Sequence, residues 1–254
     1  LAWQHAQTEQ ANELEGKLSL FGEDTAHGSN FEPALPMVEP WGRGQKLREE
    51  RDLIGFYVSG HPLDDYAAEA RTFSSVNLAD TEDVQEGRDA AVCGIVTEVT
   101  RRTTKSGRPM AFLSVEDTEG ACEVVRFSNT FEKHQHLLKV DEVLLIRGKA
   151  ENRGGLKLIA RDLLPMWRVR DELVKAITIR LDAEATDAEE LEAFAHLCEQ
   201  NRGEKKLYFE VAHPAVPRPV RLRSRTAVID PTPEVMRGMQ RLAGRDGVVL
   251  ETSS

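Results

Sequence analysis

Residues 88–165 contain short runs in which apolar and polar residues alternate, and turn-forming residues separate one run from the next. Runs of this length and period predict β-strands, because successive side chains of a strand point to opposite faces. Between the third and fourth runs, Ser128–Leu138 changes to a helical period. The segment therefore predicts a small all-β unit with one inserted helix. The strands are expected at Ala90–Val99, Met110–Val115, Cys122–Phe127, Val143–Lys149 and Leu156–Ala160.

This order of elements predicts a specific barrel. Five strands with a helix between the third and the fourth is the order of the OB-fold, a partly open Greek-key barrel that binds oligonucleotides or oligosaccharides. Gly94 inside the first strand indicates a bulge or a barrel corner. The sequence Asn152–Gly155 is typical of a hairpin turn between the last two strands. We therefore predict an OB-fold barrel over residues 88–165.

The hairpin between the first two strands carries four basic residues within eight positions and no acidic residue. Such a loop beside an open barrel face suits a phosphodiester backbone. Alternation also sends Phe112 and Phe127 outward, where they can stack on bases, although it places Glu123 on the same face. A solvated hairpin tip and aromatic rings covered by a neighbouring domain are the alternative. The predicted DNA-binding residues are Arg101, Arg102, Lys105, Arg108, Phe112, Phe127, Arg147, Lys149 and Arg153.

The distribution of charge agrees with a polyanionic ligand for the barrel alone. The chain has a formal net charge of −10, yet residues 88–165 hold 13 basic and 11 acidic side chains. The excess of acidic residues lies in residues 1–87, with 17 acidic and 6 basic side chains. The overall acidity therefore says little about what the barrel binds.

The sequence offers little support for a membrane segment or a metal site. No apolar run approaches the roughly 20 residues that span a bilayer, and the composition predicts a soluble, cytoplasmic protein. Cys93, Cys122 and Cys198 lie far apart, which favours small buried hydrophobic residues over zinc ligands or disulfides. One residue separates His134 from His136, which is not the spacing of metal ligands on a helix face. We expect neither a metal nor a cofactor in this chain.

Before the barrel, the sequence predicts helices joined by a linker. Residues 23–44 contain prolines, glycines and acidic residues without a period, so we expect a flexible linker. Gln45–Ser59 predicts a helix that Gly60 ends, followed by a shorter helix over Leu63–Thr72. His61, between the two, is expected to cap or pack rather than to catalyse. We expect one side of the first helix to be apolar and to carry Leu47, Leu53, Ile54, Tyr57 and Val58.

Residues 166–254 predict a separate α/β domain in the order β-α-β-β-α-β, a split βαβ-like sandwich. A capping box over Thr186–Glu189 is expected to open its first helix, and Asp230 its second. The expected strands are Lys175–Leu181, Lys206–Ala212, one or two within Pro219–Ile229, and Val248–Leu250. Arg221, Arg223 and Arg225 are expected on one strand face. That face could bind acidic ligands or nucleic acid, and a simple solvated face is the favoured alternative.

The stretch Glu50–Asp64, ERDLIGFYVSGHPLD, resembles a signature near the C-terminal side of bacterial DNA polymerase III alpha subunits, the family C replicative polymerases. The order of the remaining segments is also similar to that family. The resemblance implies that residues 1–22 end a helix-hairpin-helix region and contain a clamp-binding peptide. It implies a barrel that binds single-stranded template, and a C-terminal domain that binds the tau subunit of the clamp loader.

The clamp-binding peptide has a local argument of its own. Its apolar residues lie between two glycines and beside a linker too polar to cover them, so they are available to a partner pocket. The family motif resembles Gln-x-x-Leu/Met-Phe, and Lys17 departs from its glutamine, whereas Leu20 and Phe21 keep the two apolar anchors. The predicted clamp-binding residues are Lys17, Leu18, Ser19, Leu20 and Phe21.

These observations lead to two competing functions. The favoured one is a non-catalytic, C-terminal fragment of the polymerase, expected because the chain begins at Leu1. The parent polymerase holds two Mg²⁺ ions on aspartates of a palm sheet, whereas here Asp64 and Asp65 are expected together on a turn and the barrel's aspartates at strand ends. The alternative is the OB-fold anticodon-binding part of a class II aminoacyl-tRNA synthetase, against which the short segment after the barrel argues. A purely structural barrel is a third possibility. The predicted class is α+β and multidomain, divided at 1–22, 23–44, 45–87, 88–165 and 166–254.

Overall fold

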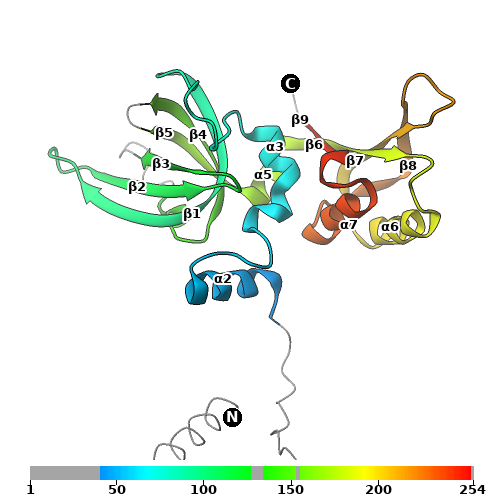
Figure 1. The fold of residues 1–254 in the computed structure, drawn as a ribbon, viewed down its shortest axis with the longest axis horizontal. Coiled ribbons are helices and arrows are strands. Elements are labelled where there is room, and N and C mark those ends of the chain that lie inside the picture. Colours follow the sequence, from blue (N-terminus) through cyan, green and yellow to red (C-terminus); the bar gives the residue numbers. More distant parts are fainter. Residues whose placement is uncertain (1–40, 127–133, 153–154, 253–254) are drawn as a thin grey trace, which may run out of the picture. The chain divides into compact units, whose positions relative to one another are not determined.

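The computed structural model describes residues 41–126, 134–152 and 155–252. Contacts between residues divide the chain into two units, residues 1–45 and 46–254. The second unit contains a β-barrel and, after it, a second β-sheet with helices (Figure 1). The predicted clamp-binding residues 17–21 and the predicted linker up to residue 40 lie outside the described residues, so both stay predictions.

The barrel has the strand order that the sequence predicts. Its strands follow the order β1-β2-β3-β5-β4 and close on themselves, with β3 and β5 parallel and the other neighbours antiparallel. The inward residues, among them Val115, Val124 and Leu158, are fully buried in one apolar cluster. The OB-fold prediction is therefore confirmed. The strands are β1 (Asp89–Thr103), β2 (Pro109–Glu116), β3 (Ala121–Arg126), β4 (Val143–Asn152) and β5 (Leu156–Pro165).

The first strand bends where the sequence places a glycine. A Cβ atom added at Gly94 would lie 2.4 Å from Cγ1 of Val115 and 2.8 Å from the carbonyl oxygen of Glu116. Two residues further on, the pairing of β1 with β2 shifts register between Val96 and Glu98. A bulge bends a strand and increases its local twist. Gly94 and this bulge together let β1 pair with β4 in its first half and with β2 in its second.

The segment between β3 and β4 is described only from residue 134 onward, and there it contains the short 3₁₀ helix η3 (Gln135–Leu137). His134 is buried, and its Nδ1 lies 2.8 Å from Nη2 of Arg126. Its Nε2 lies 3.4 Å from a carboxylate oxygen of Asp162. His134 thus belongs to a polar network that joins β3 to β5. Among the residues that the structure describes, no group of three or more histidines, cysteines and carboxylates is arranged to hold a metal ion.

The first helix is shorter than the sequence predicts. Helix α2 (Arg43–Ile54) ends at Gly55, which has a φ of +83° and whose N–H donates to the carbonyl of Arg51 (2.9 Å). Glycine tolerates this left-handed conformation, so Gly55 rather than Gly60 ends the helix. The helical phase is lost after residue 54. The predicted apolar side is wrong: Leu47 is buried, whereas Leu53 and Ile54, both inside α2, and Val58, after its end, are exposed.

Two polar side chains of α2 hold the following loop and the barrel. The Glu50 carboxylate accepts hydrogen bonds from the N–H groups of Val58 and Ser59 (both 2.8 Å) and from the Ser59 hydroxyl. Arg51 forms an ion pair with Asp141 (3.1 Å) and donates to the carbonyl of Thr97 (3.3 Å). These contacts position the signature segment against β1 and the turn before β4.

His61 is a helix cap, as the sequence predicts. It precedes the 3₁₀ helix η1 (Pro62–Tyr66), which continues into α3 (Ala67–Phe73). Its Nδ1 accepts a hydrogen bond from the N–H of Leu63 (3.1 Å), and the Asp64 carboxylate accepts one from the N–H of His61 (2.8 Å). Burial lowers the pKa of His61, because the charged imidazolium would lose its hydration.

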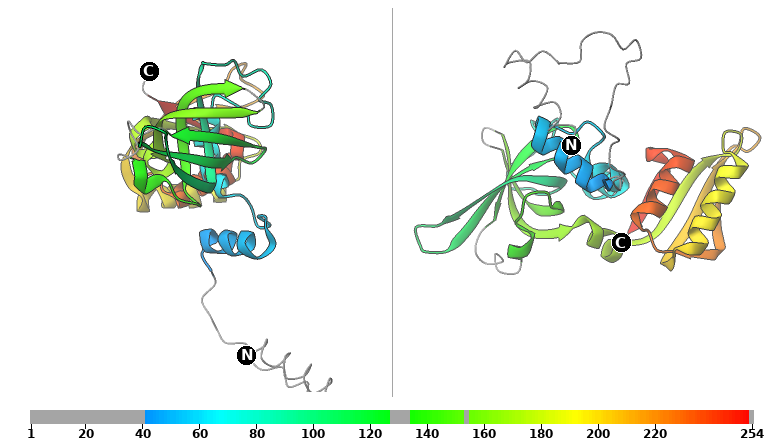
Figure 2. Two further views of the ribbon diagram at one scale, coloured as in Figure 1. Left: turned by 90° about the vertical axis from the view of Figure 1, so that its left-hand side faces the viewer. Right: turned by 90° about the horizontal axis from the view of Figure 1, so that it is seen from below.

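The second sheet has the order β8-β7-β6-β9, and both of its helices lie on one face (Figure 2). The α/β prediction is confirmed, but the split βαβ arrangement is wrong. Strands β6 and β7 are adjacent and parallel, because β8 pairs with the outer edge of β7 and no strand lies between them. The elements are β6 (Val174–Asp182), α6 (Ala188–Gln200), β7 (Arg202–Ala212), β8 (Val220–Ile229), α7 (Pro233–Ala243), the 3₁₀ helix η4 (Arg245–Gly247) and β9 (Val248–Thr252).

Both helix starts in this domain differ slightly from the prediction. The N-cap of α6 is Asp187, whose carboxylate accepts from the N–H of Glu189 (2.9 Å), so the predicted Thr186 cap is wrong. The N-cap of α7 is Thr232, whose hydroxyl accepts from the N–H of Val235 (3.3 Å), so the helix starts after Asp230 and Pro231. In each case the residue whose oxygen reaches an orphan N–H group sets the boundary.

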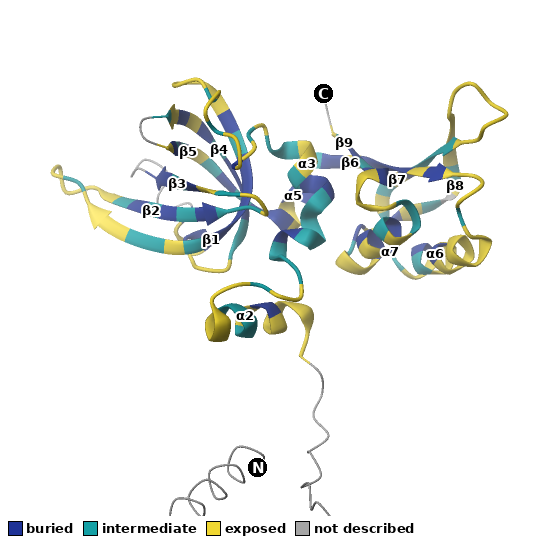
Figure 3. Cartoon of the chain, in the orientation of Figure 1, coloured by how far each residue is buried: buried dark blue, intermediate teal, exposed yellow. Residues whose placement is uncertain are grey.

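A short helix that the sequence analysis missed, α5 (Met166–Leu173), links the barrel to the second sheet. Its Met166 and Val169 are buried in a cluster with Leu63 and Cys93, next to α3 (Figure 3). Helix α3 also contributes the buried Ala68 to the core of the second sheet. Among the described residues, no helix is long and apolar enough to cross a membrane.

Candidate nucleic-acid interface

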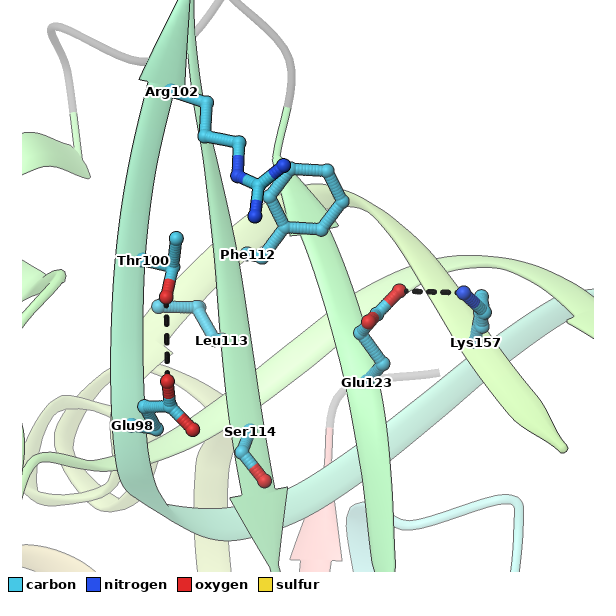
Figure 4. A pocket seen from close by; sticks show the side chains of 8 residues that line it. All are labelled: Glu98, Thr100, Arg102, Phe112, Leu113, Ser114, Glu123 and Lys157. Carbon is cyan, nitrogen blue, oxygen red and sulfur yellow. Dashed lines mark hydrogen bonds and ion pairs between the residues drawn. The ribbon is translucent and has the colours of Figure 1, made fainter.

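A cleft of about 480 Å³ lies on the outer surface of the barrel, across β1, β2, β3 and β5 (Figure 4). The volume falls in the range of small-ligand sites. Its floor is the β-sheet itself, and its side chains come from alternate positions of neighbouring strands. The lining residues are Glu98, Thr100, Arg102, Phe112, Leu113, Ser114, Glu123 and Lys157.

The register of β1 and β2 explains why these side chains meet. Thr100 pairs with Phe112, and Glu98 pairs with Ser114, so the two cross-strand pairs follow each other along the ribbon. Leu113, between Phe112 and Ser114, is buried in the barrel core. Because strand side chains alternate, Phe112 and Ser114 point to the outer face. The predicted outward direction of Phe112 is therefore confirmed, and its ring is half-buried.

The two ends of the cleft differ in charge. At one end the Arg102 guanidinium carbon lies 5.8 Å from the centre of the Phe112 ring, within the range of a cation–π interaction. At the other end lie the Glu98 carboxylate and the Ser114 hydroxyl (Figure 4). Across the cleft, Lys157 forms an ion pair with Glu123 (2.8 Å). The acidic Glu123 is thus neutralised by a cation, which weakens its effect against anion binding.

The four basic residues of the first hairpin do not act as one group. Arg102 faces the cleft, whereas Arg101, next to it in sequence, points to the other side of the ribbon and donates to the carbonyl of Leu138 (2.9 Å). Lys105 and Arg108 are exposed near the tip of the hairpin. Of the four basic residues, Arg102 therefore lines the cleft and the two tip residues are exposed to solvent. Arg101 instead binds the turn after η3.

Of the remaining four predicted DNA-binding residues, the structure describes two. Arg147 and Lys149 belong to β4 and do not line the cleft, and Lys149 donates to the carbonyl of Gly87 (2.8 Å). Phe127 and Arg153 lie outside the described residues. Their predicted roles stay predictions.

Sequence analysis missed four residues of the cleft: Glu98, Thr100, Ser114 and Lys157. Lys157 alternates with the buried Leu156 and Leu158, so the strand pattern contained its outward direction. Ser114 lies two residues from Phe112 on a strand that alternates regularly, so the pattern contained its outward direction as well. Glu98 could not be placed from the alternation alone, because the bulge between Val96 and Glu98 changes the phase of the strand.

Two of the three arginines predicted to share a face of the second sheet, Arg221 and Arg223, lie two residues apart in a regular part of β8. Arg221 lies over the ring of Tyr208 (4.4 Å to its centre) and pairs with Glu251, and Arg223 lies opposite Tyr208. The pairing then shifts register between Lys206 and Tyr208, so that Arg225 falls in an irregular part of β8. The alternation ends before it reaches Arg225, and Glu251 neutralises Arg221.

Comparison with known proteins finds one family model over the barrel and a set of curated relatives over most of the chain. A family model described as "OB-fold nucleic acid binding domain" matches residues 90–166. The DNA polymerase III subunit alpha of Escherichia coli strain K12 is 26% identical over 98% of this chain and 21% of its own length. That of Vibrio cholerae is 26% identical over 74% of this chain and 16% of its own length. The chain thus spans about a sixth to a fifth of the length of these curated relatives.

Among solved structures, a small single-stranded DNA-binding protein from Streptomyces coelicolor is 12% identical and covers 32% of this chain and 94% of its own, with a TM-score of 0.28. The structure of RecG bound to a three-way DNA junction covers 48% of this chain and 16% of its own, with 12% identity and a TM-score of 0.28.

Proposed function

Because the chain is homologous to the C-terminal fifth of DNA polymerase III alpha subunits, we propose that its barrel holds single-stranded template DNA for a replicative DNA polymerase. The observation that carries this proposal is the cleft, where an outward aromatic ring, a cation and a sheet floor lie together. The nucleotidyl transfer and the Mg²⁺ ions that serve it belong, in this proposal, to the part of the polymerase that this chain does not match.

The cleft supports single strands more than duplex. Unpaired bases can stack on an aromatic ring such as that of Phe112, whereas in a duplex the base faces are covered by their neighbours. Arg102 beside the ring, and Lys105 and Arg108 at the hairpin tip, can follow the phosphates of the strand. These contacts are largely indifferent to sequence, as a replicative enzyme requires.

The proposal extends to two tethering contacts. Residues 17–21 would bind the sliding clamp through Leu20 and Phe21, and residues 166–254 would bind the tau subunit of the clamp loader. Each contact can be weak, because DNA already holds polymerase and clamp together and raises their effective concentration. Support for both comes from the homology and, for the clamp, from the apolar peptide between two glycines.

Binding of a labelled oligothymidine, a matched duplex and a folded tRNA tests the central claim, measured by fluorescence anisotropy. We expect the single strand to bind more tightly than the other two. Phe112→Ala should weaken that binding by about 1–3 kcal/mol, the value of one base stacked on an aromatic ring. An equal loss of thermal stability would instead show that Phe112 serves the fold. Tighter binding of tRNA would favour the anticodon-binding alternative.

The hairpin cations are tested by salt dependence. The variant Arg102→Ala, Lys105→Ala, Arg108→Ala should lower the slope of log affinity against log salt by up to about 0.7 for each lost phosphate contact. Arg161→Ala is the matched control, because Arg161 is an exposed arginine of β5 that pairs with Asp89 (2.9 Å) and does not line the cleft. Equal slopes for the triple variant and the wild type would place the strand elsewhere.

The clamp contact is tested by titrating a bacterial sliding clamp with the chain and with its Leu20→Ala, Phe21→Ala variant. We expect weak binding, of micromolar order, because the peptide loses chain entropy when it becomes ordered. The double variant should lose it. Equal binding by both chains would contradict the proposed role of these two residues.

A further inference from the structure

Glu98 is a carboxylate in a cleft that is otherwise proposed to bind the phosphates and bases of a nucleic-acid strand. Its carboxylate lies in the cleft, and among the described residues its one hydrogen-bond or ion-pair partner is the Thr100 hydroxyl, at 3.3 Å. The other carboxylate of the cleft, Glu123, has Lys157 as its ion-pair partner. An ionised carboxylate repels a phosphodiester, and Glu98 is exposed and therefore accessible to a different group of the ligand.

The register places Glu98 where the edge of a stacked base would lie. The pair Glu98 and Ser114 is the next same-face pair after Thr100 and Phe112. Two residues along a strand correspond to about 7 Å. A base stacked on the Phe112 ring can therefore bring one edge to the Glu98 carboxylate and the Ser114 hydroxyl, while its phosphates lie toward Arg102 and the hairpin tip (Figure 4).

The chemistry of this pair selects one kind of base edge. An ionised carboxylate only accepts hydrogen bonds, whereas a hydroxyl can donate and accept. Cytosine, adenine and guanine carry an exocyclic amine that donates to a carboxylate. Thymine has carbonyl oxygens at the corresponding positions, and these would face the negative charge. Carboxylate acceptance from the cytosine amine is a known mode of base recognition.

We infer that Glu98 and Ser114 form a nucleobase-reading subsite which favours an amino-bearing base over thymine at the position stacked on Phe112. This inference rests on the proposed single-strand binding and adds a base preference to it. The remaining positions of the strand stay free of sequence preference, since the contacts proposed for them go to phosphates.

The test compares a ten-residue oligocytidine with an oligothymidine of equal length at pH 8, for the wild type and for Glu98→Gln. Both strands are pyrimidines, and the change in their affinity ratio between the two proteins removes differences in how the free strands stack. We expect the ratio of cytidine to thymidine affinity to fall by about 2-fold to 10-fold in Glu98→Gln, the range of one net hydrogen bond. An amide can also donate to the thymine carbonyls, which contributes to this fall.

Glu119→Gln is the matched control, because Glu119 is an exposed carboxylate in the turn between β2 and β3 and does not line the cleft. It should leave the affinity ratio unchanged. An equal ratio in wild type and Glu98→Gln, with both strands still bound, would overturn the base-reading subsite and leave the proposed function intact. Failure of the wild type to bind either strand would overturn the proposed function, and the subsite with it.

Discussion

At the scale of single residues, the N-cap at His61 makes the stability of the signature segment depend on pH. Its Nδ1 must be unprotonated to accept from the N–H of Leu63. Burial lowers the pKa of His61 below its usual 6.5, so the folded state disfavours the charged ring. The stability that the residue contributes is therefore fully present above about pH 6.5 and is lost as the pH falls through its folded-state pKa.

We predict that His61→Ala lowers the free energy of unfolding by about 1 kcal/mol at pH 7.5, the usual value of an N-cap. The difference from wild type should shrink at pH 5.5. Urea unfolding at both pH values measures it, and His196→Ala is the control, since His196 is exposed on α6. A difference that grows on acidification would contradict the neutral cap.

The sequence predicted that the cleft would contain aromatic and basic residues, but it did not predict the direction of every side chain. Alternation along β2 was enough to turn Phe112 outward, because that strand is regular from Pro109 to Glu116. It could not separate Arg101 from Arg102. Charge and spacing treat the two as equals, and the difference between them is the carbonyl of Leu138, a residue distant in sequence that accepts from Arg101.

The burial of the three cysteines was predictable from the sequence. All three are buried, as the sequence predicted, and burial raises the pKa of Cys93 and Cys122 to about 12 and that of Cys198 to about 11. Their thiolates are accordingly scarce near neutral pH, and thiol reactivity plays no part in the cleft.

At the scale of elements, strand β1 requires a glycine at position 94. A Cβ atom at residue 94 would overlap Val115 and the backbone of Glu116 on β2. We predict that Gly94→Ala destabilises the barrel by about 1–3 kcal/mol, the cost of overpacking a core. Thermal unfolding measures the effect. Gly44→Ala is the control, because a Cβ there meets nothing within 4 Å. Equal melting temperatures for both variants would show that β1 can relax around the added methyl group.

Elements with a strong period were predictable and their ends were not. The barrel strands and the two long helices of the second sheet follow from alternation and from a helical period. The end of α2 depended on which of two glycines, Gly55 or Gly60, closes its last turn. Both have a positive φ, and it is the N–H of Gly55 that donates to the carbonyl of Arg51. Apolar residues flank both glycines, so the sequence did not distinguish them. The order of β6, β7 and β8 depends on pairing between strands, which a single sequence does not contain.

At the scale of the whole second unit, one buried ion pair joins three parts of the chain. Arg170 of α5 pairs with Glu69 of α3, and both side chains are almost fully buried. Arg170 also donates to the carbonyl of Pro231 (3.0 Å), before α7, and to that of Asp65 (2.8 Å), in η1. The η1–α3 segment, helix α5 after the barrel and the second domain thus all contact one guanidinium group.

Around this pair, further contacts connect the same parts. Asp64 pairs with Arg245 (3.1 Å) and Arg71 with Asp246 (3.0 Å), while Ala68 of α3 packs into the core of the second sheet. The ion pairs are partly exposed and each is worth little. The buried pair dominates, because removal of one partner would leave the other charge desolvated and unpaired.

We therefore predict that Arg170→Met lowers the free energy of unfolding by about 3–5 kcal/mol, the cost of leaving a buried charge without its partner. Most of this loss comes from the Glu69 carboxylate, so Glu69→Leu combined with Arg170→Met should recover a large part of it. Arg168→Ala on the same helix is the matched control. Arg168 pairs with Glu172 on the exposed side of α5, where such a pair contributes less than about 1 kcal/mol. Urea unfolding of the four proteins is the test. If Arg170→Met and Arg168→Ala lower the free energy of unfolding equally, the buried pair does not hold α5, α3 and the second domain together.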